Sequence, residues 1–113
     1  MSDYPKTIAV DFDGCLCQRD WPNIGEPNLD AINALIRRKE RGDKIILWTC
    51  RDGEMLEQAV LWCREHGIEF DAVNDNLPEH KEFFGGNSRK VYANEYWDDA
   101  AVYIAAPDRK REA

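Results

Sequence analysis

The sequence predicts an α/β fold, in which a parallel β-sheet carries helices on its faces. Three short apolar runs, at residues 7–10, 44–49 and 69–73, have the length and composition of buried strands. Two amphipathic stretches separate these runs, and such strand–helix alternation is typical of a parallel sheet. The chain has 113 residues, of which 43% are hydrophobic and 33% charged. We therefore expect one globular domain over residues 1–113, with a frayed charged tail at 107–113.

The first strand, Thr7–Val10, is rich in β-branched residues, as buried strands are. Residues 15–27 contain prolines and a glycine without any sustained period, which predicts a loop or a small flap. Asn28 is expected to cap a helix that runs to about Arg41, because apolar residues recur there at helical spacing.

The second strand is expected at residues 44–49, and Asp52 is expected to cap the helix that follows it. Gly67 should end this helix, and the third strand should occupy residues 69–73. Residues 74–87 are polar and contain a proline and a glycine pair, which predicts a loop. Glu95–Trp97 is expected to be a fourth strand and Val102–Ile104 a fifth.

Charge and composition exclude several classes of function. The net charge of −7 disfavours binding to long nucleic acid or to an anionic membrane surface. No run of 18 apolar residues exists, and the polar N-terminus lacks the apolar core of a signal peptide. The four cysteines, at positions 15, 17, 50 and 63, have no C-x-x-C zinc spacing. We expect a cytoplasmic protein with reduced thiols.

Two acidic pairs, each directly after a predicted strand, form the strongest candidate for a reaction site. Asp11 and Asp13 face the same side if the chain is extended there, and Gly14 allows a sharp turn behind them. Asp98 and Asp99 follow the fourth strand. Carboxylates that converge repel one another unless a cation lies between them, and all-oxygen ligands suit Mg²⁺. Solvated acidic loops are the alternative, but two pairs placed in this way favour a site.

Other polar residues follow or precede the same strands. Thr49 ends the second strand, where its hydroxyl can donate to a phosphoryl oxygen, and Lys90 offers a charge for the same oxygens. Asn74 ends the third strand and is a candidate to line the site. Arg51 and Arg89 are candidates to bind a second anionic group of the substrate. Taken alone, each of these residues also fits an ordinary strand, turn or surface position.

In this order the residues resemble the four motifs of the haloacid dehalogenase-like (HAD) phosphohydrolase superfamily. The motifs span about residues 6 to 104 and are Asp11–Gly14, the strand ending in Thr49, Lys90, and Asp98–Asp99. The resemblance implies a three-layer Rossmann-like parallel sheet flanked by helices. Cys15 stands where members usually have threonine. The short spacing from Lys90 to Asp98 is similar to that of small capless phosphatases and of the phosphatase half of polynucleotide kinase-phosphatases.

The resemblance implies a Mg²⁺-dependent phosphatase that acts on a small phosphorylated substrate. Asp11 would be the nucleophile that forms an aspartyl-phosphate, and Asp13 would protonate the leaving alcohol and then deprotonate the attacking water. Thr49 and Lys90 would stabilise the transferring phosphoryl group. Mg²⁺ would be held by four groups: Asp11, the backbone carbonyl of Asp13, Asp98, and Asp99 directly or through water.

The segments between the motifs are too short for a cap domain, so an open site is expected. Such a site either accepts a phosphate displayed on something large or is covered by another subunit of a homo-oligomer, and the sequence leaves both possibilities open. Cys15 and Cys50 are expected to flank the acidic cluster, and Cys17 is close in sequence. For Cys15 and Cys50 a packing role is favoured over a redox role, which would need a low thiol pKa.

Three other functions compete with this hypothesis. The first is a nucleotide or polynucleotide 3′-phosphatase, where the net charge argues against long nucleic acid but not against a mononucleotide. The second is a non-catalytic HAD-like module that binds phosphate or metal without turnover. The third is a phosphoacceptor domain of the response-regulator type. Its accepting Asp would end the third strand, where this chain has Asn74, so the order of motifs fits poorly.

Overall fold

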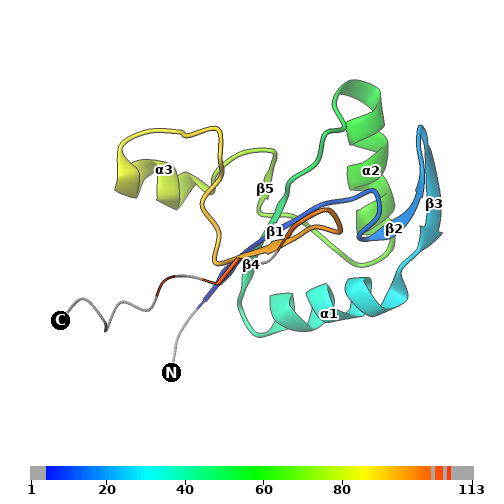
Figure 1. The fold of residues 1–113 in the computed structure, drawn as a ribbon, viewed down its shortest axis with the longest axis horizontal. Coiled ribbons are helices and arrows are strands. Elements are labelled where there is room, and N and C mark those ends of the chain that lie inside the picture. Colours follow the sequence, from blue (N-terminus) through cyan, green and yellow to red (C-terminus); the bar gives the residue numbers. More distant parts are fainter. Residues whose placement is uncertain (1–4, 103, 106, 108–113) are drawn as a thin grey trace.

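The computed structural model describes residues 5–102, 104, 105 and 107. Four strands form a parallel sheet in the order β5-β4-β1-β6, and two more form an antiparallel hairpin (Figure 1). This arrangement confirms the predicted α/β class with a parallel sheet and flanking helices. In chain order the elements are β1 (Thr7–Val10), β2 (Cys17–Asp20), β3 (Asn23–Pro27), α1 (Leu29–Glu40), β4 (Lys44–Leu47), α2 (Gly53–Glu65), β5 (Ala72–Val73), α3 (Pro78–Phe84) and β6 (Glu95–Trp97).

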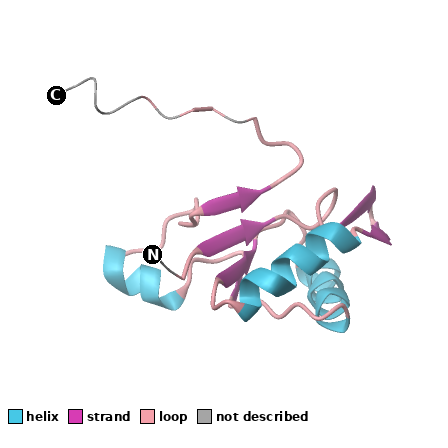
Figure 2. Cartoon of the chain, turned by 90° about the horizontal axis from the view of Figure 1, so that it is seen from below, coloured by secondary structure: helices cyan, strands magenta, loops and turns pink. Residues whose placement is uncertain are grey.

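The order of the strands decides which face of the sheet each helix covers. From β1 to β4 to β5 the chain moves in one direction across the sheet, so right-handed crossovers place α1 and α2 on the same face. The chain then returns past β1 to β6, which puts the connection that contains α3 on the other face. Figure 1 shows α1 and α2 together and α3 apart from them, and Figure 2 shows the strand arrows of the sheet pointing the same way.

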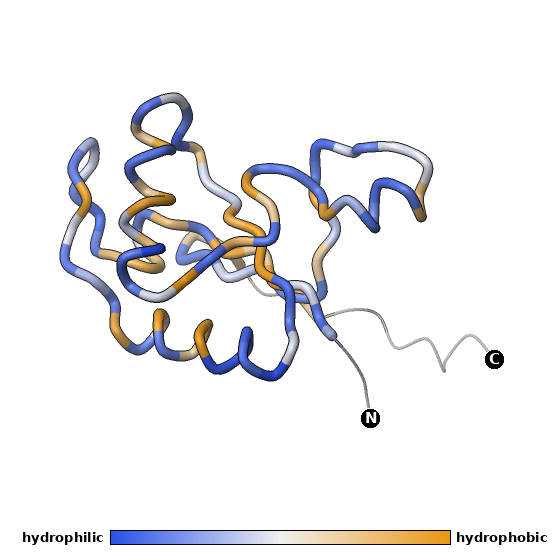
Figure 3. The backbone as a smooth tube through the Cα atoms, turned by 180° about the vertical axis from the view of Figure 1, so that it is seen from behind, coloured by the Kyte–Doolittle hydropathy of each residue, from blue (hydrophilic) through white to orange (hydrophobic). Residues whose placement is uncertain are grey.

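Alternate residues of the central strands supply two separate hydrophobic clusters. On one face, Val10 and Leu47 pack with residues of α1 and α2 such as Leu35. On the other face, Ala9 and Ile46 pack with Leu77, Val91 and Ala93, which come from the connection around α3. All four residues of β1 are buried, as expected for a parallel strand that is covered on both sides. Figure 3 shows this hydrophobic band at the centre of the molecule.

An ion-pair cluster ties the amino ends of the strands together, away from their carboxyl ends. Arg38 of α1 donates to Asp43 at 2.6 Å and makes a paired contact with Glu95, the first residue of β6. Asp43 also accepts from the backbone N–H of Lys6, just before β1. The cluster thus joins α1 to the strands at one edge of the sheet and leaves the opposite edge for other chemistry.

The structure differs from the sequence-based expectations in the connections. Residues 15–27 form the β2–β3 hairpin, although the residues of β2 after Cys17 are exposed and polar and show no alternation. Helix α3 lies inside the predicted loop 74–87, with Pro78 at its start and Gly85 at its end in the left-handed conformation (φ 72°). Strands β4 and β5 are shorter than predicted, and the Asp52 side chain makes no capping hydrogen bond.

Two expectations concern the C-terminal part of the chain. The predicted fifth strand at 102–104 includes residue 103, which lies outside the described residues. Most of the predicted tail, residues 108–113, also lies outside them. Among the residues that are described, no helix has the length and apolar character needed to cross a membrane.

Candidate functional site

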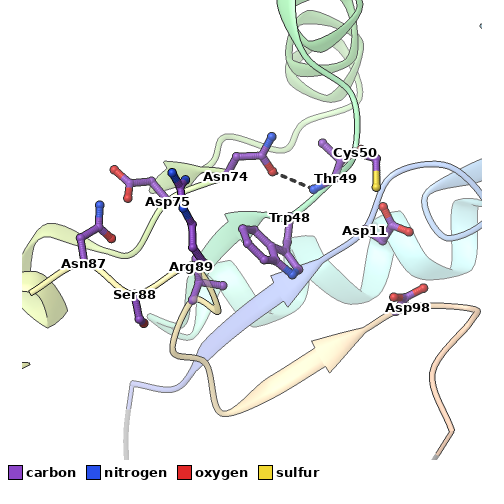
Figure 4. A pocket seen from close by; sticks show the side chains of 11 residues that line it. Asp11, Trp48, Thr49, Cys50, Asn74, Asp75, Asn87, Ser88, Arg89 and Asp98 are labelled. Atoms are coloured by element: carbon purple, nitrogen blue, oxygen red, sulfur yellow. Dashed lines mark hydrogen bonds between the residues drawn. The ribbon is translucent and has the colours of Figure 1, made fainter.

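The carboxyl ends of the parallel strands meet at a pocket of about 460 Å³. The pocket brings together Asp11 after β1, Thr49 after β4, Asn74 after β5 and Asp98 after β6. This confirms that the strand ends predicted from the sequence converge. Figure 4 shows Asp11, Cys50 and Asp98 at one end of the pocket and Asn87, Ser88 and Arg89 at the other, with Trp48 between them.

Three carboxylates form a tight acidic cluster beside this pocket. Asp11, Asp98 and Asp99 each offer a carboxylate oxygen, and these oxygens lie within 4.8 Å of one another. The backbone N–H of Asp11 donates to the carbonyl of Trp97 at 2.9 Å, which holds the ends of β1 and β6 side by side. The donor set is all oxygen and strongly anionic, so its chemistry fits a hard divalent cation.

The environment of Asp11 opposes its ionisation. Burial raises the pKa of this carboxyl group most, and the nearby Asp98, Asp13 and Asp99 raise it further. A hydrogen bond from the backbone N–H of Phe12 to Asp11 Oδ1, at 2.7 Å, acts in the opposite direction. A cation beside Asp11 would relieve both the burial of the charge and the repulsion from its neighbours.

The turn after Asp13 has a left-handed backbone conformation that favours glycine, and two side chains lie close to it. Gly14 has a φ of 81°, and a Cβ atom there would collide with the carboxylate of Asp99 and with Arg19. Arg19 of β2 donates to Asp99 from Nε at 3.1 Å and from Nη2 at 2.9 Å. The guanidinium holds the pKa of Asp99 below its usual range. The β2–β3 hairpin therefore places the positively charged side chain of Arg19 against the acidic cluster.

Asn74 shapes the loop that carries Thr49. The backbone N–H of Thr49 donates to Asn74 Oδ1 at 2.8 Å, the contact drawn in Figure 4. Asn74 has a φ of 51°, a left-handed conformation that asparagine tolerates better than most residues. The hydroxyl oxygen of Thr49 accepts from the backbone N–H of Arg51 at 3.2 Å. Thr49 and Asn74, both candidates from the sequence, thus line the pocket, and Asn74 also holds the turn.

Arg51, a predicted substrate-binding residue, lines a second pocket with Asp11, Thr49 and Asp98, but its guanidinium is already paired with a carboxylate. Its side chain is fully buried and pairs with Asp13, at 2.9 Å from Nε to Oδ2 and 2.8 Å from Nη2 to Oδ1. A buried charge needs a partner of opposite sign, and Asp13 provides it. The Asp13 carboxylate accordingly faces Arg51 and is not among the three carboxylates of the acidic cluster.

Lys90 lies apart from the residues with which it was expected to act. Its ammonium group is 5.5 Å from the centre of the Tyr96 ring, and it lines a neighbouring pocket with His80 and Tyr92. Arg89, one residue earlier, lines the pocket that contains Asp11, so these two adjacent side chains serve different pockets. Within the described residues, Arg89 is the one basic side chain that lines this pocket, whereas Arg19 and Arg51 line a second pocket that also contains Asp11.

The cysteines near the site are free thiols. Burial, together with the nearby charge of Asp11, raises the pKa of Cys15 to about 11. A thiol that resists ionisation is a poor nucleophile, which agrees with the packing role expected for Cys15. Cys50 is exposed and lines the pocket with Asp11.

Sequence reasoning missed two arginine contacts in this region. Arg19 reaches the acidic cluster from the hairpin, and the expectation of a loop or a small flap at residues 15–27 gave no reason to place it there. Arg51 was assigned to substrate because the sequence cannot show that its guanidinium is enclosed. The only sequence signal for the pair was that Arg51 and Asp13 each lie within a few residues of a predicted strand end. Such proximity does not by itself indicate an ion pair.

Comparison with models of known protein families finds no match, and comparison with curated proteins finds none either. Among solved structures, the chain is similar to a conserved protein from Bacteroides thetaiotaomicron. The two sequences are 40% identical, the TM-score is 0.77, and the match covers 93% of this chain and 84% of the other. That degree of identity over that length places both chains in one family.

Proposed function

The chain belongs to the same family as the conserved Bacteroides thetaiotaomicron protein, and we propose that it is a Mg²⁺-dependent phosphomonoester hydrolase of the HAD-like type. One observation carries the proposal. Polar side chains from four separate strand ends, Asp11, Thr49, Asn74 and Asp98, share a single pocket next to a cluster of three carboxylates. Ligands of parallel α/β folds bind at this edge of the sheet.

Asp11 is the nucleophile in this proposal. Its Oδ1 accepts from the backbone N–H of Phe12, which fixes the orientation of the carboxylate at the end of β1. One of its oxygens attacks phosphorus, the bond to the leaving oxygen breaks, and an aspartyl-phosphate forms on Asp11. Asp13 gives a proton to the leaving oxygen and later takes one from the attacking water.

Mg²⁺ would be held by Asp11, Asp98, the backbone carbonyl of Asp13, and Asp99 directly or through water. When bound, it neutralises charge so that an anionic carboxylate can approach an anionic phosphate. Without it, burial first and then repulsion from the neighbouring carboxylates raise the pKa of Asp11.

Thr49 donates its hydroxyl proton to a phosphoryl oxygen, and Asn74 holds the Thr49 backbone in place. Arg89 lies at the far end of the same pocket, across Trp48 from Asp11, where it binds a second anionic or polar group of the substrate (Figure 4). In this proposal Arg89, and not Lys90, supplies the positive charge that the pocket offers to an anionic substrate, because Lys90 contacts Tyr96.

The experiment measures phosphate release from 4-nitrophenyl phosphate and from a panel of small phosphomonoesters, with Mg²⁺ or with EDTA. We expect turnover only with Mg²⁺ and none in Asp11→Asn. Mononucleotides and 3′-phosphorylated oligonucleotides in the panel separate the general phosphatase from the nucleotide-specific alternative.

A non-catalytic module that binds phosphate or metal is the second candidate. Two contacts favour it. Asp13 is held by Arg51 and Lys90 lies over Tyr96, so two residues that a phosphatase would use in turnover are engaged elsewhere. Under this alternative, Mg²⁺ and phosphate raise the melting temperature of the protein, but no ester in the panel is hydrolysed.

A further inference from the structure

Arg51 has the largest side chain among the fully buried residues of the described chain. An arginine remains charged inside a protein, so its burial is tolerated only where counter-charge and hydrogen-bond acceptors surround it. Arg51 has no role in the proposed reaction, although it contacts Asp13, the proposed proton donor.

The guanidinium of Arg51 connects three segments that are distant in sequence. It makes two parallel hydrogen bonds to Asp13 and donates to the backbone carbonyls of Asn23, at 3.0 Å, and Pro22, at 3.4 Å. Its central carbon lies over two aromatic rings, 5.0 Å from the centre of the Trp21 ring and 5.1 Å from the centre of the Phe12 ring. The loop after β4 is thereby joined to the loop after β1 and to the tip of the hairpin.

Both oxygens of Asp13 accept from this one guanidinium, which fixes the plane and direction of the carboxylate. Lysine cannot reproduce the contact, because its ammonium is a single point charge without the planar fork. The Asp13 carboxylate is 15% exposed and borders a second cavity of about 460 Å³, which Arg51 also lines and which shares Asp11, Thr49 and Asp98 with the first pocket. Asp13 therefore contacts Arg51 and lies in the same cavity as Asp11, to which the reacting phosphate would bind.

We propose that Arg51 is a positioning residue, which orients Asp13 for proton transfer and is itself held in place by the hairpin tip at residues 21–23. This inference rests on the proposed phosphatase function. In the transfer, one Asp13 oxygen leaves its contact with Arg51, carries the proton that Asp13 took from the attacking water in the previous turnover, and gives it to the leaving oxygen, while the other oxygen keeps its contact. The remaining hydrogen bond to the guanidinium thus keeps the Asp13 carboxyl group close to the substrate.

The activity test compares esters that differ in their need for a proton donor. In Arg51→Lys, we expect kcat/KM for an alkyl phosphate, which reports phosphoryl transfer to Asp11 and not the later hydrolysis, to fall by about 10- to 100-fold, a large part of what general acid catalysis supplies. The kcat/KM for 4-nitrophenyl phosphate, whose leaving group needs little protonation, should fall much less. In an Asp13→Asn background, Arg51→Lys should add no further loss. Equal losses with both esters would overturn the proposal, because a structural defect does not discriminate between leaving groups.

Arg38→Lys is the matched control. Arg38 also makes a paired contact with a carboxylate, Glu95, but at the opposite edge of the sheet. Its replacement should lower stability and leave the ratio of the two rates unchanged. If Arg51→Lys does not fold, Trp21→Ala provides the second variant, because Trp21 is 60% exposed yet covers the guanidinium. It should show the same leaving-group dependence, and an unchanged ratio would overturn the proposal.

A measurement without turnover distinguishes failure of this inference from failure of the proposed function. Thermal unfolding is measured for Asp13→Asn, Arg51→Gln and the double variant in EDTA. The two losses should be strongly non-additive, since each substitution alone leaves the other group buried without its partner. Absence of phosphate release by the parent protein would defeat the function, and additive losses would defeat the Arg51–Asp13 coupling.

Discussion

Arg19 and Asp99 face each other across 80 positions of sequence, with two hydrogen bonds of 2.9 and 3.1 Å between guanidinium and carboxylate. Arg19 belongs to the hairpin and Asp99 follows β6, so the contact ties the hairpin to the acidic cluster at the strand ends. Both side chains are substantially exposed, at 59% and 37%. A cation that binds the cluster through Asp99 must compete with this arginine.

Replacement of Arg19 should therefore tighten metal binding. In Arg19→Gln, Asp99 loses its competing cation and the potential at the cluster becomes more negative, so we expect Mg²⁺ affinity to rise by about two- to fivefold, in line with the modest strength of exposed ion pairs. Isothermal titration calorimetry at low ionic strength measures the effect, and Arg37→Gln on α1 controls for the loss of one positive charge. Weaker binding in Arg19→Gln would mean that Arg19 positions Asp99 for the metal.

Asp11 should destabilise the metal-free protein at neutral pH. Burial and the nearby carboxylates raise its pKa in the folded state, so the folded protein binds this proton more tightly than the unfolded chain. The stability that this proton contributes is present in acid and is lost as pH rises through the raised pKa. In EDTA at pH 7, Asp11→Asn should melt a few degrees higher than the parent, and the difference should shrink as pH falls towards 4. A lower melting temperature at pH 7 would contradict the repulsion argument.

Asp98 should be needed for metal binding and not for folding. Asp98 is exposed, and it belongs to a cluster whose members repel one another. Asp98→Ala should keep or slightly raise the melting temperature in EDTA and lose most of the rise that Mg²⁺ gives the parent protein. Thermal unfolding with and without Mg²⁺ tests this, with Asp30→Ala on the exposed side of α1 as the control. Unfolding of Asp98→Ala in EDTA would make Asp98 structural.

The sheet could be predicted because its signals are local. Buried parallel strands such as Thr7–Val10 are continuous apolar runs, and Asn28 caps α1 through a contact only three residues away. Pro78 and Gly85 marked the ends of α3 as well, but the polar composition between them suggested a loop. The strand ends that converge at Asp11, Thr49, Asn74 and Asp98 followed from the parallel topology alone.

The contacts that the sequence could not show are long-range pairings of charged residues. The partner of Arg51 is 38 positions away and that of Arg19 is 80 positions away. An isolated arginine in a sequence gives no indication of which carboxylate it will meet, or whether it will be enclosed. Lys90 illustrates the same limit, because the direction of one side chain decides whether it reaches Asp11 or Tyr96, and spacing does not determine that direction.

The positions of Arg89 and Lys90 predict different consequences of removing each charge. Arg89 lines the pocket with Asp11, whereas the Lys90 ammonium lies over the Tyr96 ring in the neighbouring pocket. Arg89→Gln should raise KM about tenfold for an ester that carries a second anionic group and much less for 4-nitrophenyl phosphate. Lys90→Gln should leave kcat/KM within about twofold for both esters. A large fall in kcat for Lys90→Gln would show that residues 86–91 rearrange to bring the lysine to the phosphoryl group.

Asp11 and Asp13 are two residues apart, yet their surroundings differ enough to give them different tasks. Asp11 joins the acidic cluster, and Asp13 is held by Arg51. Asp11→Asn should form no covalent intermediate with any ester. Asp13→Asn keeps the nucleophile, so it should still react with 4-nitrophenyl phosphate, but its aspartyl-phosphate should persist because no base activates water. Acid quench followed by peptide mapping should then find the phosphate on Asp11 alone. Phosphate on Asp13, or full activity in Asp11→Asn, would reverse or remove these assignments.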